Sequence, residues 1–496
     1  MSMDQPSNPT GIPAAVRALI GPTDRLPVGD GGITVAATRE VHFPFDGTLV
    51  ATSPLGSAAD AVAAIDAAAG VRATVAGLRT GVRRAVLQDI TALVRAHREA
   101  LVDLLVLETG KPLVDCRVEV DRTILTWSLA AEEPARLHGE TVPVDLLPGS
   151  EGLIGYFTRR PAGVVVGIAG FNYPLMLASH KIAPAIAAGC PVVVKPAPAT
   201  PLATLWLVDR IREVLVANDA PAAAVQLVTG EADVGVALTT DPRVAVVSFT
   251  GSATVGHAIA RACAPRKAVL ELGSNAALVI CADADLDRAV DAVLRGGYYA
   301  SGQACISVQR LIVESAVADE VRRRILDRLP EVVVGDPREE TTRVSALIDA
   351  RATDATLQRI SDAVDAGAQV LAGGERRGSA IAPTLLAGVP SSAEAWEQEI
   401  FAPVVALREV ADVDEAFAVV NDSRYGLHAA VFTSSLATAH RAIDILEVGG
   451  VVINDVPGFR SDAMPYGGVK DSGIGREGPH WAVEEFTVTR MAVIRP

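Results

Sequence analysis

Short apolar runs rich in valine and isoleucine alternate with stretches of helical periodicity from residue 164 onward. Such runs predict strands buried on both faces, and the helical stretches between them predict crossover connections in a parallel sheet. The pattern therefore predicts an α/β fold with doubly wound sheets, whose ligand-facing groups lie at the carboxyl ends of the strands. Strands are expected at residues 164–168, 192–194, 244–249, 268–272 and 276–280.

The rest of the chain adds helices and an extended segment. The apolar residues between 58 and 107 have helical spacing and predict two long helices, and a third helix is expected at 118–132. Residues 137–160 are extended and punctuated by Pro and Gly, which predicts a projecting hairpin or a linker. A second alternating stretch runs from residue 276 to about 450, so two α/β domains fit the 496 residues better than one.

The composition argues against several classes of partner. The formal charge is -15, whereas nucleic acid and anionic membranes are bound by clustered Lys and Arg. Residues 1–9 contain no apolar leader segment, and Pro and Lys residues break the longest uncharged stretches, so we expect a cytoplasmic protein without a membrane span. The five cysteines form no C-x-x-C pair and the eight histidines no metal-spaced pair, so neither a disulfide framework nor a metal site is expected.

Two segments look like ligand-binding motifs but are interpreted as structural. Residues 473–478 match G-x-G-x-x-G, but they follow a polar loop rather than a strand, which predicts a loop or a helix-entry turn. Residues 283–287 resemble a calcium loop without its turn glycine. Their acidic residues favour the N-terminus of a helix.

Three polar side chains stand where chemistry is expected. Cys305 follows a glycine and small residues, and its thiol fits either a nucleophile or a small buried hydrophobe. Glu271 ends an apolar strand and fits either a general base or an ion pair. Asn172 follows the strand at 164–168 and fits either an oxyanion donor or a turn residue. Taken singly, these residues leave both interpretations open.

A series of short motifs that contains these residues resembles the aldehyde dehydrogenase superfamily. The resemblance extends from about Pro44 to the C-terminus, and the step from Glu271 to Cys305 also matches. So many motifs in family order favour the functional interpretation of all three residues. The motifs are Glu108-Thr109-Gly110-Lys111-Pro112, Phe171-Asn172-Tyr173-Pro174, Lys181-Ile182-Ala183-Pro184, Lys195-Pro196, Phe249-Thr250-Gly251-Ser252, Glu271-Leu272-Gly273, Gly302-Gln303-Ala304-Cys305, Glu399-Ile400-Phe401 and Pro465-Tyr466-Gly467-Gly468.

The resemblance implies oxidation of an aldehyde to the carboxylic acid through a thioester. It makes Cys305 the nucleophile and assigns the oxyanion to the Asn172 side chain and the Cys305 backbone N–H. Glu271 would activate the water that hydrolyses the thioester. Lys181 is similar to the family's lysine near the path of proton release.

The resemblance also implies NAD or NADP as the cofactor. The turn at Gly251 and Ser252 opens a helix whose N-terminus favours pyrophosphate. Lys195 would reach the adenosine ribose and Glu399 the nicotinamide ribose. Pro198 replaces the glutamate that NAD-selective members commonly carry three residues after this lysine, so the choice between NAD and NADP stays open. The remaining expected cofactor residues are Gly230, Val255 and Phe401.

The sequence around the site resembles the branch of the family that contains lactaldehyde, phosphonoacetaldehyde and sulfoacetaldehyde dehydrogenases. The substrates of that branch are small and often anionic. Arg122 and Arg460 are candidates for pairing with a substrate anion, and the alternative is that both arginines are structural or interfacial. Ala304 weakens the phosphonate case, because no basic residue stands beside the nucleophile. Expected apolar walls of the substrate pocket are Phe171, Tyr173 and Phe459.

The resemblance implies a Rossmann-type NAD(P)-binding domain, an α/β catalytic domain and a small β oligomerisation arm. The cofactor domain would comprise residues 1–139 and 162–272, the catalytic domain residues 273–479, and the arm residues 140–161 and 480–496. The family is usually dimeric or tetrameric, so a homodimer or homotetramer is implied.

Alternative functions have distinguishable consequences. A semialdehyde dehydrogenase that passes the acyl group to CoA would form no acid without added CoA, and that branch typically lacks the carboxylate found here as Glu271. A non-catalytic binding or structural protein that retained the fold is disfavoured by the intact set Cys305, Glu271 and Asn172. A papain-like hydrolase would leave the dinucleotide motifs unexplained, and no histidine is tied to Cys305 by sequence.

Overall fold

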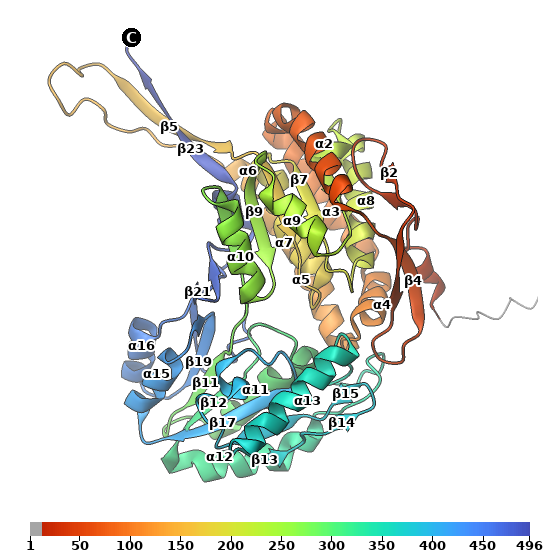
Figure 1. The fold of residues 1–496 in the computed structure, drawn as a ribbon. Helices are drawn as coiled ribbons and strands as arrows, with labels where there is room; N and C mark the ends of the chain where they lie inside the picture. The colour runs from red at the N-terminus through yellow and green to blue at the C-terminus, as the bar shows by residue number, and fades with distance from the viewer. Residues whose placement is uncertain (1–11) are drawn as a thin grey trace, which may run out of the picture.

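The computed structural model describes residues 12–496 as two α/β halves, one above the other, with a two-stranded arm that projects from the upper half (Figure 1). The expectation that residues 1–9 carry no leader segment lies outside the described residues. Within residues 12–496 no single helix is long and apolar enough to cross a membrane; α2 (Ala58–Ala76) and α3 (Thr80–Ala96) reach that length and composition only as a pair bent by 119°.

The upper half contains a six-stranded sheet with the order β22-β10-β9-β6-β7-β8. Five strands are parallel and β22 is antiparallel to β10. Val165 and Val194 pack into one apolar cluster, and the adjacent residues Val166 and Val193 pack into another. Both faces of the sheet are therefore buried. The strands are β6 (Val164–Ile168), β7 (Val192–Lys195), β8 (Val225–Leu227), β9 (Val244–Thr250), β10 (Lys267–Glu271) and β22 (Gly473–Ile474).

Helices cover both faces of this sheet. The prediction of two long helices between residues 58 and 107 is wrong, because there are three. α2 ends at Ala76 and is followed by Gly77. At His97 the backbone leaves the helical range (φ -105°, ψ 15°), so α3 and α4 are separate. The third predicted helix is α5, which begins earlier than expected, directly after Pro112. The other helices are α1 (Ala14–Arg17), α4 (Arg98–Thr109), α5 (Leu113–Ala130), α6 (Glu133–Arg136), α7 (Pro174–Ala188), α8 (Leu202–Ala217), η1 (Ala222–Ala224), α9 (Ala232–Thr240) and α10 (Ala253–Cys263).

The lower half contains a seven-stranded sheet with the order β13-β16-β17-β12-β11-β19-β20. All neighbours are parallel except β13 and β16. The strands are β11 (Ala277–Ile280), β12 (Arg310–Glu314), β13 (Gln369–Ala372), β16 (Thr384–Ala387), β17 (Val404–Val410), β19 (His428–Phe432) and β20 (Gly450–Ile453). The helices are α11 (Leu286–Tyr298), η2 (Tyr299–Gly302), α12 (Ser315–Arg328), η3 (Leu329–Glu331), α13 (Ala350–Asp365), α14 (Glu394–Glu397), α15 (Val413–Asn421) and α16 (Leu436–Ile445).

The predicted α/β fold and all five predicted strands are confirmed. Asp285 caps the N-terminus of α11 by accepting from the Arg288 N–H, as the interpretation of residues 283–287 expects. The interpretation of residues 473–478 is wrong in part, because Gly473 and Ile474 form β22. This dipeptide adds to the open edge of the sheet beside β10, a long-range pairing that its own sequence does not signal.

The projecting arm consists of β5 (Ile154–Pro161) and β23 (Thr487–Ile494), which pair antiparallel (Figure 1). α17 (Pro479–Glu485) leads the chain back from the upper half into β23. The boundaries expected for the three domains stay a prediction. Short two-stranded ribbons complete the fold: β1 (Arg25–Leu26) with β2 (Ile33–Thr34), β3 (Thr38–His42) with β4 (Leu49–Pro54), β14 (Arg376–Arg377) with β15 (Ala380–Ile381), and β18 (Tyr425–Gly426) with β21 (Val469–Lys470).

Candidate active site

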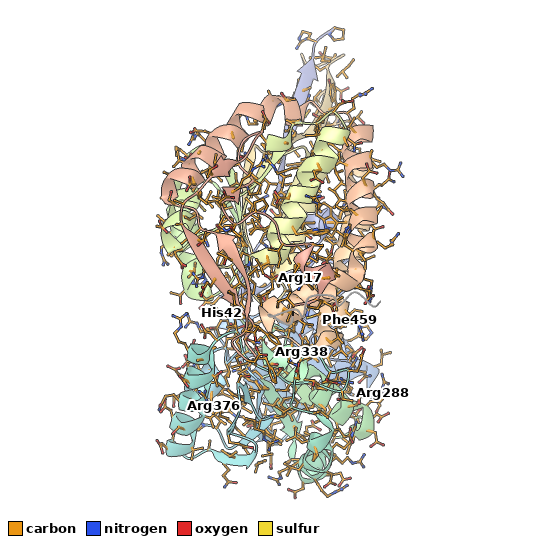
Figure 2. The ribbon with its side chains drawn as sticks, turned by 90° about the vertical axis from the view of Figure 1, so that its right-hand side faces the viewer. Arg17, His42, Arg288, Arg338, Arg376 and Phe459 are labelled. Carbon is orange, nitrogen blue, oxygen red and sulfur yellow. The ribbon has the colours of Figure 1, made fainter. Side chains whose placement is uncertain are left out.

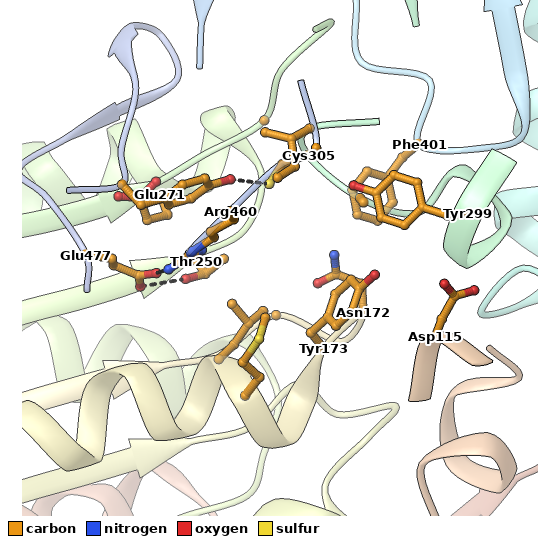
Figure 3. A pocket seen from close by; sticks show the side chains of 18 of the residues that line it. Asp115, Asn172, Tyr173, Thr250, Glu271, Tyr299, Cys305, Phe401, Arg460 and Glu477 are labelled. Carbon is orange, nitrogen blue, oxygen red and sulfur yellow. Dashed lines mark hydrogen bonds and ion pairs between the residues drawn. The ribbon is translucent and has the colours of Figure 1, made fainter. Parts of the chain in front are cut away.

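A cavity of about 650 Å³ is lined by residues at the carboxyl ends of β9 and β10, such as Thr250 and Glu271, and by residues of the lower half, such as Cys305 and Glu399. Its walls unite segments that are far apart in sequence, and Figure 3 shows the Asn172 amide directed toward Cys305 across it. Most residues expected at the site line this cavity. They are Arg122, Phe171, Asn172, Tyr173, Gly251, Ser252, Glu271, Cys305, Glu399, Phe401, Phe459 and Arg460.

Four expected residues do not line the cavity. Lys181 is fully buried behind it on α7. Lys195 ends β7, and Gly230 adopts a φ of 149° just before α9. Val255 is exposed on the first turn of α10. Cofactor contacts for the last three residues stay a prediction.

Cys305 follows a tightly constrained turn. Ala300, Ser301 and Gly302 in η2 all have positive φ, and a Cβ at Gly302 would lie 2.1 Å from the Ala402 carbonyl oxygen. The Cys305 Sγ lies 3.1 Å from the hydroxyl oxygen of Tyr466. Burial raises the pKa of the Cys305 thiol to about 12, although the Tyr466 hydroxyl opposes this rise. The thiol is therefore hard to ionise without help from its neighbours.

Asn172 is held by contacts on both sides. Its side-chain Nδ2 donates to the Gln303 carbonyl at 2.9 Å, two residues before the cysteine, and its own carbonyl accepts from Lys111 Nζ at 2.8 Å. Lys111 is fixed in turn by Glu119, at 2.5 Å. An amide nitrogen has two hydrogens, so one remains for a ligand in the cavity.

Glu271 is the last residue of β10 and is buried, with 4% of its surface exposed. Neither carboxylate oxygen has a hydrogen-bond partner in the described structure. Burial, and then the negative charge of Glu477, raises the pKa of Glu271 well above its ordinary value. An unpartnered carboxyl group with a raised pKa in a cavity wall fits a proton acceptor better than an ion-pair partner.

Glu477 behaves in the opposite way, although it is equally buried. Its Oε1 accepts from Lys181 Nζ at 2.8 Å, and the same lysine donates to Thr250 Oγ1 at 2.7 Å. Burial opposes its ionisation, but the charges of Lys181, His180 and Arg460 prevail and hold the pKa of Glu477 well below its ordinary value. The site thus contains two buried glutamates whose pKa values are shifted in opposite directions.

Both candidate anion-binding arginines already face carboxylates. Arg122 Nη2 lies 2.7 Å and Nε 3.2 Å from the two oxygens of Asp462. Arg460 Nη2 lies 3.4 Å from Glu477 Oε2, and its guanidinium lies 3.7 Å from the Tyr466 ring centroid. These contacts favour the structural interpretation of the two arginines.

The apolar walls include an aromatic pair. The rings of Phe171 and Phe401 pack edge to face, with centroids 5.7 Å apart. Phe459 is half exposed and lies at the level where the two halves meet (Figure 2). Tyr173 lies under Lys111, whose Nζ is 3.7 Å from the centre of the ring. The cavity therefore offers an aldehyde a wall that is partly aromatic.

The carboxyl edge of the six-stranded sheet also fits a dinucleotide. Gly251 and Ser252 line the cavity at the N-terminus of α10, and the Ser252 side chain forms no capping bond to that helix. Burial lowers the pKa of Lys195 to about 8, against the charges of Glu231 and Asp233. Burial raises the pKa of Glu399 to about 7, and its Oε1 accepts from the Ser274 N–H at 2.9 Å.

Tyr466 and Glu477 received no role from the sequence. Tyr466 stood in one of the motifs, and Glu477 stood in the glycine-rich segment interpreted as a turn. The position of Tyr466 within a motif could have marked it as a wall residue. No sequence pattern indicates its contact with the Cys305 thiol, which lies 161 residues away in the chain.

Comparisons with known proteins agree with one another. A family model described as "Aldehyde dehydrogenase family" matches residues 34–492. The 3-sulfolactaldehyde dehydrogenase of Priestia aryabhattai is 38% identical over 413 residues, which cover 83% of this chain and 86% of the relative. Aldehyde dehydrogenase 21 from Physcomitrella patens, solved with its reaction product succinate, superposes with a TM-score of 0.92 at 35% identity and covers 96% and 99% of the two chains. GapN from Methanocaldococcus jannaschii, a glyceraldehyde-3-phosphate dehydrogenase solved with NADP, has a TM-score of 0.89 at 34% identity and covers 93% and 100%.

Proposed function

This chain belongs to the aldehyde dehydrogenase family, and we propose that it uses Cys305 as the nucleophile when it oxidises an aldehyde to the carboxylic acid with NAD(P). The observation that carries this proposal is the meeting of Cys305, Asn172 and Glu271 around one cavity, although they come from three distant segments. Glu271, with both oxygens free of partners, supports hydrolysis of the thioester by water rather than transfer to CoA.

The proposed first step is attack of the Cys305 thiolate on the aldehyde carbon. The C–S bond forms while the carbonyl π electrons move to oxygen, and the Asn172 amide donates to this oxyanion. A bound NAD(P) would supply the acceptor for the hydride that leaves the same carbon. The residues that would hold the dinucleotide are Gly251 and Ser252 at the N-terminus of α10, together with Lys195 and Glu399.

In the second step Glu271 takes a proton from water, whose oxygen attacks the thioester carbon. The C–S bond then breaks and its electrons return to sulfur. Lys181, Glu477 and Thr250 form a hydrogen-bonded group. The charges of Glu477 and Lys181 act on Glu271, and this group would pass the proton away from the cavity.

The substrate is proposed to be a small aldehyde, and relatives with anionic substrates in their names favour an anionic one. Recognition of that anion would fall to Arg122, because 21% of its side chain is exposed whereas only 5% of that of Arg460 is. Arg122 would then have to share Asp462 with the substrate. A neutral hydroxyaldehyde would leave the Arg122–Asp462 pair intact.

The test of this function is NAD(P)H formation at 340 nm with a panel of aldehydes and no added CoA. The panel contains lactaldehyde, succinic semialdehyde, phosphonoacetaldehyde and benzaldehyde, each with NAD and with NADP. We expect acid as the product and its complete loss in Cys305→Ala. Cys281→Ala is the control, since that buried cysteine lies outside the cavity. Undiminished activity of Cys305→Ala would refute the proposal, and a requirement for CoA would favour the acylating alternative.

We further propose a homo-oligomer built through the arm. Many apolar side chains on β5, β23 and the loop before β5 are exposed, as expected of a surface that another protomer covers. They are Leu146, Leu147, Ile154, Tyr156, Val488, Met491, Val493 and Ile494.

A further inference from the structure

The ring of Tyr466 is held rigidly beside the nucleophile. Tyr466 lies in the loop between β20 and β21, where its backbone N–H donates to the Glu477 carbonyl at 3.1 Å and its carbonyl accepts from the Glu477 N–H at 2.7 Å. The ring is 98% buried, as its exposed fraction is 2%. His428 packs against it edge to face at 5.1 Å, and the Arg460 guanidinium lies 3.7 Å from its centre. The hydroxyl group therefore has little freedom to move.

The hydroxyl group of Tyr466 contacts the Cys305 sulfur. The distance between Oη and Sγ is 3.1 Å, and the dashed line at Cys305 in Figure 3 marks this contact. A buried tyrosine hydroxyl normally has a hydrogen-bond partner, and within the described structure the partner here is the thiol. Neutral sulfur is a weak acceptor, whereas a thiolate is a strong one. The hydrogen bond is therefore strongest when the sulfur is a thiolate.

We propose that Tyr466 is a catalytic residue that donates a hydrogen bond to the Cys305 thiolate and so sets how readily the nucleophile ionises. This inference rests on the proposed role of Cys305. It goes beyond that role, because it assigns the activation of the thiol to a group other than the general base.

The protonation states support this direction of the bond. Burial, and then the nearby Cys305, raises the pKa of Tyr466 well above its ordinary value, so the phenol keeps its proton and can act only as a donor toward a thiolate. The positive charge of Arg460 over the ring polarises the hydroxyl and also favours the anionic sulfur. Burial destabilises the thiolate, and a hydrogen bond from the Tyr466 hydroxyl offsets part of this destabilisation.

The same bond acts when the thioester breaks. As the tetrahedral intermediate collapses, the C–S bond electrons move to sulfur, the carbonyl forms again, and the hydroxyl that came from water stays on carbon. The sulfur departs as a thiolate and again accepts from Tyr466. Loss of the hydroxyl is therefore expected to slow both formation and hydrolysis of the thioester.

The experiment is the pH dependence of iodoacetamide alkylation, with labelling at Cys305 confirmed by peptide mass. The four other cysteines are buried, so Cys305 reacts first. We expect Tyr466→Phe to raise the midpoint by about one pH unit, the difference expected between a charged and a neutral acceptor. A rise of one unit leaves about tenfold less thiolate at a fixed pH below the midpoint. The less acidic thiolate is intrinsically more reactive, so labelling should fall by only about threefold. Tyr298→Phe is the matched control, because its hydroxyl is buried in the lower half and donates to the Thr384 carbonyl.

Two further variants keep the outcomes separate. If Tyr466→Phe does not fold, 3-fluorotyrosine at position 466 keeps the shape with a more acidic hydroxyl, and it should lower the midpoint. An unchanged midpoint in either variant overturns the inference. Turnover that survives in Cys305→Ala instead overturns the proposed function, whatever the alkylation midpoint shows.

Discussion

Two buried glutamates at the centre of the site have pKa values shifted in opposite directions. Glu271 has no hydrogen-bond partner, while Glu477 is surrounded by Lys181, His180 and Arg460. The charge of Glu477 also raises the pKa of Glu271. A general base with a raised pKa is ionised only at higher pH, so the hydrolytic step should accelerate as the pH rises through that pKa.

The charge of Glu477 can be tested at the level of this residue. Glu477→Gln removes the like charge and leaves Lys181 less compensated, so the pKa of Glu271 should fall. We expect the midpoint of the rise of kcat with pH to move to lower pH by about one unit or more, even if the maximal rate also falls. The measurement is kcat against pH under saturating substrate and cofactor.

Glu331→Gln serves as the control, because Glu331 is exposed and pairs only with the surface residue Arg328. Its profile should match that of the unchanged protein. A midpoint in Glu477→Gln that stays in place or moves upward would contradict the assigned coupling between the two glutamates.

At the level of elements, the turn formed by η2 determines where Cys305 lies. The non-glycine residues Ala300 and Ser301 adopt positive φ there, which is costly and persists only under surrounding constraints. Those constraints are visible: the Ser301 hydroxyl accepts from the Ser345 N–H at 2.9 Å, and the Gln303 side chain accepts from the Ile348 N–H at 3.0 Å. The turn is fixed to the segment before α13 and delivers Cys305 to the cavity.

Gly302→Ala is expected to disrupt this turn. Its φ of 72° and the clash of a new Cβ with the Ala402 carbonyl would displace the backbone that leads to Cys305. We expect Tm to fall by about 5 °C or more and kcat/KM to fall at least about tenfold. Calorimetry and steady-state kinetics measure the two effects.

Gly378→Ala separates backbone strain from the clash. Gly378 has a similar φ of 65° but open space around it, so the substitution should cost only about 1 kcal/mol and leave kcat/KM unchanged. Equal effects of the two substitutions would show that the contact with Ala402 is unimportant.

For the whole molecule, the arm concentrates apolar surface far from either core. β5 and β23 pair with each other over their full length in the projecting arm (Figure 1), and residues 140–142 add hydrogen bonds to the other edge of β5. Both strands leave apolar side chains exposed. A second protomer that covers this surface would explain why the arm projects at all.

The double substitution Val488→Glu and Val493→Glu should dissociate the oligomer, since it places charges on the exposed surface of β23. Light scattering coupled to size exclusion is expected to show the mass of the assembly fall to that of a single chain. Leu436→Glu is the matched control, because Leu436 is 73% exposed on α16, far along the chain from the arm. A protein that is monomeric before any substitution would contradict the proposed assembly.

The sequence by itself determined the class of fold, because period-two and helical patterns report directly which faces of a segment are buried. It placed Glu271 at a strand end, and the order of its motifs predicted the family. It could not show that α3 and α4 are separate helices, since the buried residues Val94 and Leu101 keep a seven-residue helical spacing across the break at His97.

Only the tertiary structure decided what each side chain contacts. It paired Arg122 with Asp462, brought Glu477 next to Lys181, and placed the Tyr466 hydroxyl on Cys305. Such contacts join segments separated by more than a hundred residues, and they depend on how two sheets and their loops pack. Local periodicity carries no information about that packing, which is why the sequence predicted a role for Cys305 but not its contact with Tyr466.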